Sequence, residues 1–137
     1  MGFWIRDLNL GFYAPTQDID AEEYIFFHES LCVLSALLHI DAVGYQPNHT
    51  TIFSDNSNTV DIYNSLKASP RVNPILMAAC DVALESCSDF KVLFIPGIEN
   101  QVADALSRFD FDRARAISPG IDIQPFTPPR ITLGEDV

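Results

Sequence analysis

Three carboxylates stand where folding could bring them together to do metal chemistry. Asp55 directly follows a short apolar run, Glu29 lies in a segment with helical spacing, and Asp104 lies beyond a strand and a turn. Hard divalent cations such as Mg²⁺ and Mn²⁺ prefer carboxylate oxygens as ligands. Two such ions about 4 Å apart can hydrolyse a phosphodiester, because they neutralise the attacked phosphate and stabilise the attacking and leaving oxygens.

The segment from Phe94 to Arg108 positions Asp104. Its Pro-Gly pair at 96–97 ends a strand, and Asn100 is placed to cap the helix that follows. Val102 and Leu106 form an apolar stripe on that helix, and alanines on both sides leave Asp104 uncrowded. A lone aspartate on a helix is normally just solvated. Asp104 is a candidate metal ligand only because of the motif around it.

The other predicted elements come from apolar periodicity and turn residues. We expect a hairpin over 2–14, a polar loop over 15–23, a helix from about Tyr24 to 44–49, a strand over 51–54, a helix over 58–67, a helix from Asn73-Pro74 and a strand over 91–95. The buried helix faces are predicted to contain Phe27, Leu31, Leu34 and Leu38; Val60, Tyr63 and Leu66; and Leu76, Ala79, Cys80, Ala83 and Leu84. This order favours an α/β fold, a mixed sheet flanked by helices, over residues 1–108.

Residues 109–137 have a different character. Prolines recur without a period at 119, 125, 128 and 129, which indicates an extended C-terminal tail and not a second domain. Phe126 and Ile131 are candidates to pack on the body, and the alternative is that the segment is a linker.

Composition limits the function. The chain has 137 residues, 47% of them hydrophobic, which is enough for one ordinary core. Its 8 basic and 19 acidic residues give a net charge of −11, so we expect weak unaided affinity for nucleic acid.

With no secretory signal pattern and no apolar run of roughly 20 residues, the sequence predicts an intracellular protein, cytoplasmic or nuclear, without a membrane partner. Reduced cysteines are expected, and zinc-like spacing, a Gly-rich phosphate loop and a serine-nucleophile elbow are absent from the sequence.

The motifs resemble the ribonuclease H domain of retrotransposon reverse transcriptases. The run Pro-Gly-Ile-Glu-Asn-Gln-Val-Ala-Asp-Ala-Leu-Ser-Arg over 96–108 is similar to the last motif of that family. Residues 25–29, followed by Leu31 and Leu34, resemble its first helix, and residues 51–56 resemble its strand that ends in Asp. The resemblance implies that Glu29, Asp55 and Asp104 are catalytic metal ligands, with Mg²⁺ or Mn²⁺ as cofactor and an RNA/DNA hybrid as substrate. Asn56 has two open roles: an Asx-type turn that orients the chain after Asp55 and holds the next helix, which is favoured, and direct contact with substrate.

Only the end of the family's first-strand motif is present in this sequence. The family begins its first strand with an Asp in a pattern close to D-A-S-x-x-G-x-G-F-W, and this chain starts at Met1-Gly2-Phe3-Trp4. The resemblance therefore implies an N-terminally truncated domain without that Asp, and Asp7, after the aromatic pair, is not its equivalent. Exposed strand edges would then favour self-association as a homo-oligomer. Two functions stay open: a nuclease with impaired activity, and a catalytically inactive element-derived remnant that acts as a self-associating binding or structural protein.

Overall fold

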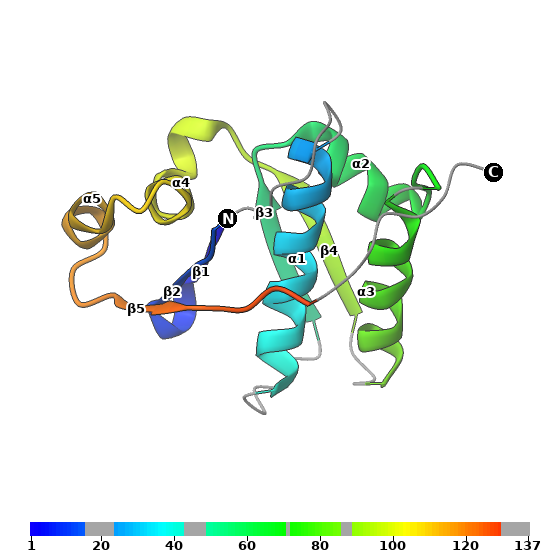
Figure 1. Cartoon of the computed structure of the whole chain (residues 1–137), viewed down its shortest axis with the longest axis horizontal. Helices are drawn as coiled ribbons and strands as arrows, with labels where there is room; N and C mark the ends of the chain where they lie inside the picture. The colour runs from blue at the N-terminus through cyan, green and yellow to red at the C-terminus, as the bar shows by residue number, and fades with distance from the viewer. Residues whose placement is uncertain (16–23, 43–48, 71, 86–88, 130–137) are drawn as a thin grey trace.

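The computed structural model describes residues 1–15, 24–42, 49–70, 72–85 and 89–129. Within these residues, five strands form two small sheets (Figure 1). In the first, β1 (Gly2–Ile5) and β2 (Leu10–Tyr13) form the predicted antiparallel hairpin, and β5 (Asp122–Pro125) pairs parallel to β2. In the second, β3 (His49–Ser54) and β4 (Asp89–Phe94) pair in parallel. The chain is thus mixed α/β, and its small mixed sheet is flanked by helices, but the strands do not all join one sheet.

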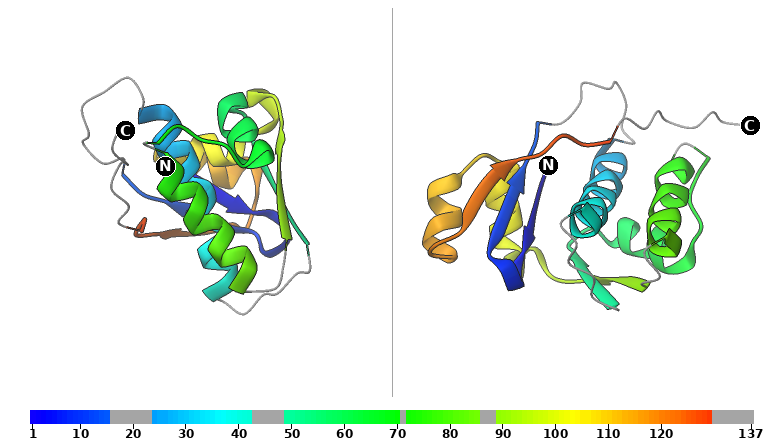
Figure 2. Two further views of the ribbon diagram at one scale, coloured as in Figure 1. Left: turned by 90° about the vertical axis from the view of Figure 1, so that its right-hand side faces the viewer. Right: turned by 90° about the horizontal axis from the view of Figure 1, so that it is seen from below.

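Helices divide between the two sheets. α1 (Tyr24–Ala42), α2 (Ser57–Ser65) and α3 (Asn73–Glu85) gather about β3 and β4, whereas α4 (Gln101–Ser107) and α5 (Phe111–Ile117) lie on the side of β1, β2 and β5 (Figures 1 and 2). α1 stands between the two groups and also contacts β1. None of the helices in the described part of the chain is both long enough and apolar enough to cross a membrane.

The larger core confirms the predicted face of the first helix. Phe27, Leu31 and Leu34 are at most 1% exposed, and they pack with apolar side chains of α2, α3 and β4. Burial of each such side chain contributes about 1.5–3 kcal/mol relative to exposure, so this interface fixes α1. In this core, α3 contributes the buried side chains of Ile75, Leu76 and Ala79, and β4 contributes Val92.

Two predicted core residues are wrong. Leu66 is 59% exposed, because α2 ends before it and its backbone is left-handed, with φ of 55°. Leu84 is 76% exposed in the last turn of α3. Helical spacing continues through both positions in the sequence, but the surface that each would need as a partner is absent from the described fold.

The segment after Arg108 is also more structured than predicted. α5 and β5 replace the expected extended chain, and Ala114 and Ile121 pack in a second core with Val102 and Leu106. Phe126 does pack on the body, with its ring centroid 5.0 Å from that of Phe3. Ile131, the loop over 16–23, the predicted helix end over 44–48 and Cys87 lie outside the described residues.

Candidate functional site

The turn that carries Asp55 is held by hydrogen bonds on both sides. The backbone N–H of Asn56 donates to the hydroxyl of Ser54 at 3.2 Å, and the side-chain oxygen of Asn56 accepts from the backbone N–H of Thr59 at 3.1 Å. Asn56 is therefore the cap of α2, as the Asx-type alternative predicts. Since β3 and α2 are both fixed, Asp55 has a defined place at the strand end and is exposed there.

Glu29 reaches the same region from α1. The hydroxyl of Tyr63 on α2 donates to the backbone carbonyl of Ser30 at 2.7 Å, in a buried contact that fixes the two helices relative to each other. Glu29, the residue before Ser30, is partly buried. The following 3₁₀ turn, Gly97–Glu99, comes close to Asp55 as well, because a Cβ added at Gly97 would lie 3.5 Å from Asp55 Oδ2.

Electrostatics links Glu29 to Asp55. Burial raises the pKa of Glu29, the negative charge of Asp55 raises it further, and the N-terminal ammonium of Met1 opposes both effects. Two carboxylates that repel in a partly desolvated place are stabilised by a cation that binds both. These two residues thus have the donor type that Mg²⁺ or Mn²⁺ prefers, and they lie near enough for the charge of Asp55 to act on Glu29.

The neighbouring thiol of Cys32 does not suit nucleophilic chemistry. Burial, with a smaller contribution from the charge of Glu29, raises the pKa of Cys32 to about 12. Its Sγ donates to the backbone carbonyl of Gly2 at 3.2 Å. A thiol that remains protonated and hydrogen-bonded inside the protein is a packing group.

Asp104 has different partners. Its Oδ1 accepts from Arg108 Nε at 3.1 Å, and its Oδ2 accepts from Arg113 Nη1 at 3.0 Å. Burial by itself would raise the pKa of Asp104, but the hydrogen bonds from Arg113 and Arg108, with their positive charges, lower it. Asp104 is therefore an ionised carboxylate with an arginine on each oxygen.

The helix under Asp104 begins differently from the prediction. Asn100 precedes α4, but its side chain makes no capping hydrogen bond. The backbone N–H groups of Glu99 and Asn100 instead donate to the carbonyls of Pro96 and Gly97, at 2.9 and 3.0 Å, so a 3₁₀ turn starts the helix. Val102 and Leu106 are buried, which confirms the predicted apolar stripe.

The predicted triad therefore divides into a pair and a separate residue. Within the described residues, no three His, Cys, Asp or Glu side chains are grouped so that they could hold a metal ion. Glu29 and Asp55 interact electrostatically, whereas each oxygen of Asp104 pairs with an arginine.

Arg113 is the residue at this site that the sequence interpretation missed. Asp104 and Arg108 have the i,i+4 spacing of a helical ion pair, so that contact could have been found. Arg113 lies on another helix, nine residues beyond Asp104, and no local pattern indicates the contact.

Comparison with protein-family models, curated proteins and solved structures gives no match for this chain.

Proposed function

We propose that this chain is a ribonuclease H-like domain related to those of retrotransposon reverse transcriptases, and that it hydrolyses the RNA strand of RNA/DNA hybrids. The observation that carries the proposal is the approach of Glu29 to Asp55 from two different elements, close enough for one charge to raise the pKa of the other. The order and type of the motifs support the same assignment.

Each carboxylate has a separate task in the proposed reaction. Asp55, at a strand end and next to the capped start of α2, offers oxygens on a rigid base, and Glu29 supplies a second carboxylate from α1. Asp104 is the third ligand in the proposal, once it leaves its arginines. The bound Mg²⁺ or Mn²⁺ would neutralise charge on the phosphate and activate water. The residues of this chain hold the ion and fix its place relative to the substrate.

Nucleic acid is expected to bind weakly to this domain alone. The net charge of −11 repels a polyanion, and a divalent ion on the acid pair offsets only part of that repulsion. Activity is accordingly expected to be low at low ionic strength, where this repulsion is least screened.

The test is cleavage of an RNA/DNA hybrid labelled on both strands, in Mg²⁺ and separately in Mn²⁺. Asp55→Asn and Glu29→Gln should each lower cleavage of the RNA strand by about 10²-fold or more, because each removes an oxygen ligand. Asp61→Asn is the matched control, since Asp61 is exposed on α2, and it should retain parental activity. Absence of cleavage by the parent protein with both ions would contradict the proposed reaction.

A second candidate function is supported by the sheets. With the strands divided as β1-β2-β5 and β3-β4, sheet edges remain that could pair with another chain. Phe53 on β3 (53% exposed) and Leu93 on β4 (39% exposed) are also neighbours in register. These features favour a self-associating binding or structural protein without catalysis.

Sedimentation velocity separates this alternative from the nuclease. The parent should form a dimer that Phe53→Ser weakens, while Leu84→Ser, which removes an exposed leucine from α3, leaves it intact. A monodisperse monomer at the highest concentration reached would contradict self-association. Dimerisation and cleavage are measured on the same samples, so either result stands without the other.

A further inference from the structure

Phe109 occupies a backbone position that usually takes glycine. Its φ is 59°, in the left-handed region, just beyond α4. The backbone N–H of Asp110 donates to the carbonyl of Ala105 at 2.9 Å, and that of Phe109 donates to the carbonyl of Leu106 at 3.2 Å. This pair of hydrogen bonds is the Schellman motif, in which glycine is common because a Cβ strains the left-handed backbone. Phe109 therefore carries backbone strain, and strained residues of this kind gather at functional sites.

The ring of Phe109 completes an aromatic cluster and stays half open to solvent. Its centroid lies 5.5 Å from that of Tyr13 and 6.1 Å from that of Phe111, and the last two are 4.7 Å apart. Tyr13 ends β2 and Phe111 begins α5, so the cluster lies on the side of the β1-β2-β5 sheet away from α1 (Figure 2). Both are partly buried, whereas Phe109 is 49% exposed. Two rings thus support a third that solvent reaches.

Positive charge gathers one helical turn before this ring. Arg108, the residue before Phe109, and Arg113 donate to the carboxylate of Asp104 at 3.1 and 3.0 Å. Because Asp104 is ionised, these three side chains together have a net positive charge. Over residues 101–120, three arginines balance three aspartates, so the rest of the chain carries the whole excess of 11 negative charges. A polyanion therefore meets less repulsion at α4 and α5 than over the acidic remainder.

The exposed ring suits one flat ligand better than a protein surface. A specific protein interface buries about 800 Å² on each partner, whereas a nucleobase needs a single aromatic face for stacking. The phosphate beside a base needs donors, and the side chain of Arg108 is 72% exposed. An arginine has five N–H donors, of which the one at Nε serves the contact with Asp104. Phe109 and Arg108 thus match the two parts of a nucleotide.

We propose that Phe109 is a stacking platform for an unpaired base of a nucleic-acid strand, and that Arg108 contacts the phosphate next to that base. This inference rests on the proposed function for the class of ligand, but it requires no metal ion and no contact with Glu29 or Asp55. A stacked base holds a single-stranded part of the strand at α4 and α5, and its affinity does not depend on net charge. Stacking accepts RNA and DNA alike, so either strand of a substrate fits.

The experiment measures fluorescence anisotropy of a labelled oligoadenylate RNA of about 12 nucleotides, a length that one small domain can cover. The full chain is titrated in EDTA, so neither metal binding nor cleavage contributes. At about 0.15 M salt the Debye length is about 8 Å, and repulsion from distant carboxylates is largely screened. Polyphosphate is the competitor that has charge and no bases.

Phe109→Leu removes the ring and keeps an apolar side chain. We expect it to weaken binding about five-fold or more, the lower end of what one stacked base contributes, and Phe109→Trp should restore binding. Phe94→Leu is the matched control, because Phe94 is 54% exposed on β4, and it should bind as the parent does. If circular dichroism shows that leucine disturbs α4, Phe109→Asn is the second variant without a ring, since asparagine tolerates the left-handed backbone.

Arg108→Gln tests the phosphate contact. Its control is Arg115→Gln, because Arg115 lies on α5, has a 57% exposed side chain and pairs with Asp112 at 3.5 Å. Each variant removes one positive charge, so long-range attraction for the RNA falls in both. We expect Arg108→Gln to bind about two- to five-fold more weakly than Arg115→Gln, the range of an exposed charge contact. Equal affinities would overturn the role assigned to Arg108.

Equal affinities of the parent and Phe109→Leu would overturn the platform, and so would absence of binding or competition by polyphosphate as strong as that by unlabelled RNA. A dimer in sedimentation velocity that Phe109→Leu dissociates would overturn it too, because the ring would then be a protein contact. If binding depends on Phe109 but the RNA/DNA hybrid is not cleaved, the platform stands and the proposed reaction fails. If the parent cleaves the hybrid and Phe109→Leu binds and cleaves equally well, only the platform fails.

Discussion

At Glu29, burial and a neighbouring negative charge act in the same direction, and both disfavour the ionised side chain. The folded pKa is therefore above the unfolded value. The contribution of this residue to stability is fully present below pH about 4.5 and is lost as the pH rises through the folded pKa. Above that pH, the fold loses stability relative to the unfolded chain, because Glu29 ionises more readily when it is fully hydrated.

Glu29→Gln should remove that cost. In metal-free buffer at pH 7, we expect the free energy of unfolding to increase or stay equal, and the excess of the variant over the parent should shrink as the pH falls toward 4.5. Urea unfolding from pH 4 to 8 measures the difference. Asp61→Asn is the exposed control, and a Glu29→Gln protein that is less stable throughout this range would make Glu29 a structural residue.

His39 should show the opposite pH dependence. Its ring lies against Phe12 with centroids 4.2 Å apart, and burial lowers its pKa. Within the described structure, its Nε2 is buried without a hydrogen-bond partner. The stabilising contribution is therefore present above the unfolded pKa of about 6.5 and is lost as the pH falls, because the unfolded chain takes up a proton first.

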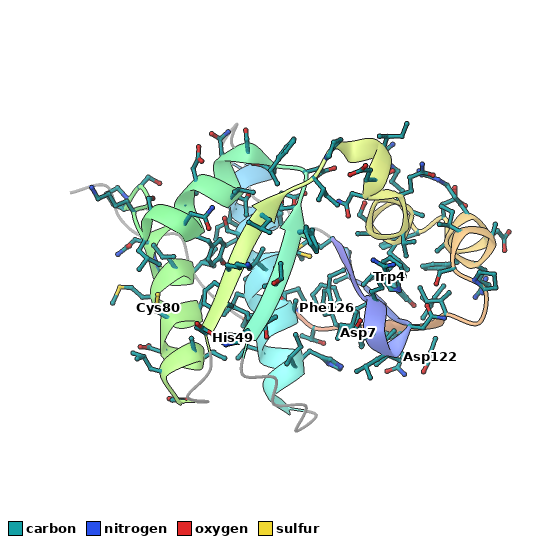
Figure 3. All side chains as sticks on the ribbon, turned by 180° about the vertical axis from the view of Figure 1, so that it is seen from behind. Trp4, Asp7, His49, Cys80, Asp122 and Phe126 are labelled. Carbon is teal, nitrogen blue, oxygen red and sulfur yellow. The ribbon has the colours of Figure 1, made fainter. Side chains whose placement is uncertain are left out.

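We expect the parent to lose stability relative to His39→Phe between pH 7.5 and 5.5, in urea unfolding monitored by circular dichroism. The phenylalanine keeps a ring against Phe12 and cannot titrate. His49→Gln is the control, because His49 is exposed at the start of β3 (Figure 3). If the pH dependence disappears in His49→Gln and persists in His39→Phe, the effect belongs to His49 and the prediction for His39 is wrong.

At the scale of elements, the approach of α4 to the hairpin depends on Gly2. A Cβ at this position would lie 2.6 Å from the backbone nitrogen of Ser107 and 2.9 Å from Leu106 Cβ. The backbone cannot yield as a side chain can, so α4 must shift away from β1. Because α4 carries Asp104, this packing also determines where that carboxylate stands.

Gly2→Ala should destabilise the chain by about 1–3 kcal/mol, the usual cost of overpacking. Gly97→Ala is the matched control: its Cβ would be 3.5 Å from Asp55 Oδ2, an ordinary contact, and the change should stay within about 0.5 kcal/mol. Thermal unfolding of the two variants beside the parent measures both. Equal stability of Gly2→Ala and the parent would show that α4 does not depend on this close contact.

Local spacing predicted those elements whose own residues decide their structure. The hairpin, the face of α1 around Leu31 and the Asn56 cap follow from neighbours within a few positions of each other. β5 was missed because it pairs with β2, far earlier in the chain, and α5 because its order comes from packing against α4 in the second core. For the site, the motif resemblance led to Glu29 and Asp55, but the partners of Asp104 depend on how two helices pack.

For the whole molecule, the proposed function implies that the acid pair couples folding to divalent ions. The folded chain brings Glu29 near Asp55, whereas the unfolded chain separates them, so an ion that uses both stabilises the fold. The excess of 11 negative charges adds a second effect, because any salt screens self-repulsion. Mg²⁺ must therefore be compared with NaCl at equal ionic strength before a specific site is inferred.

The corresponding prediction concerns the melting temperature with and without Mg²⁺. At a free concentration of 100 times Kd, one site should stabilise the fold by about 2.7 kcal/mol, which for a chain of this size is a rise of several degrees. NaCl of matched ionic strength should give a smaller rise that is the same in the parent and in Asp55→Asn. The additional Mg²⁺ effect should vanish in Asp55→Asn and persist in Asp61→Asn. If Mg²⁺ and NaCl act alike on all three proteins, the carboxylates respond only to screening, and the structure keeps Glu29 and Asp55 together without a metal.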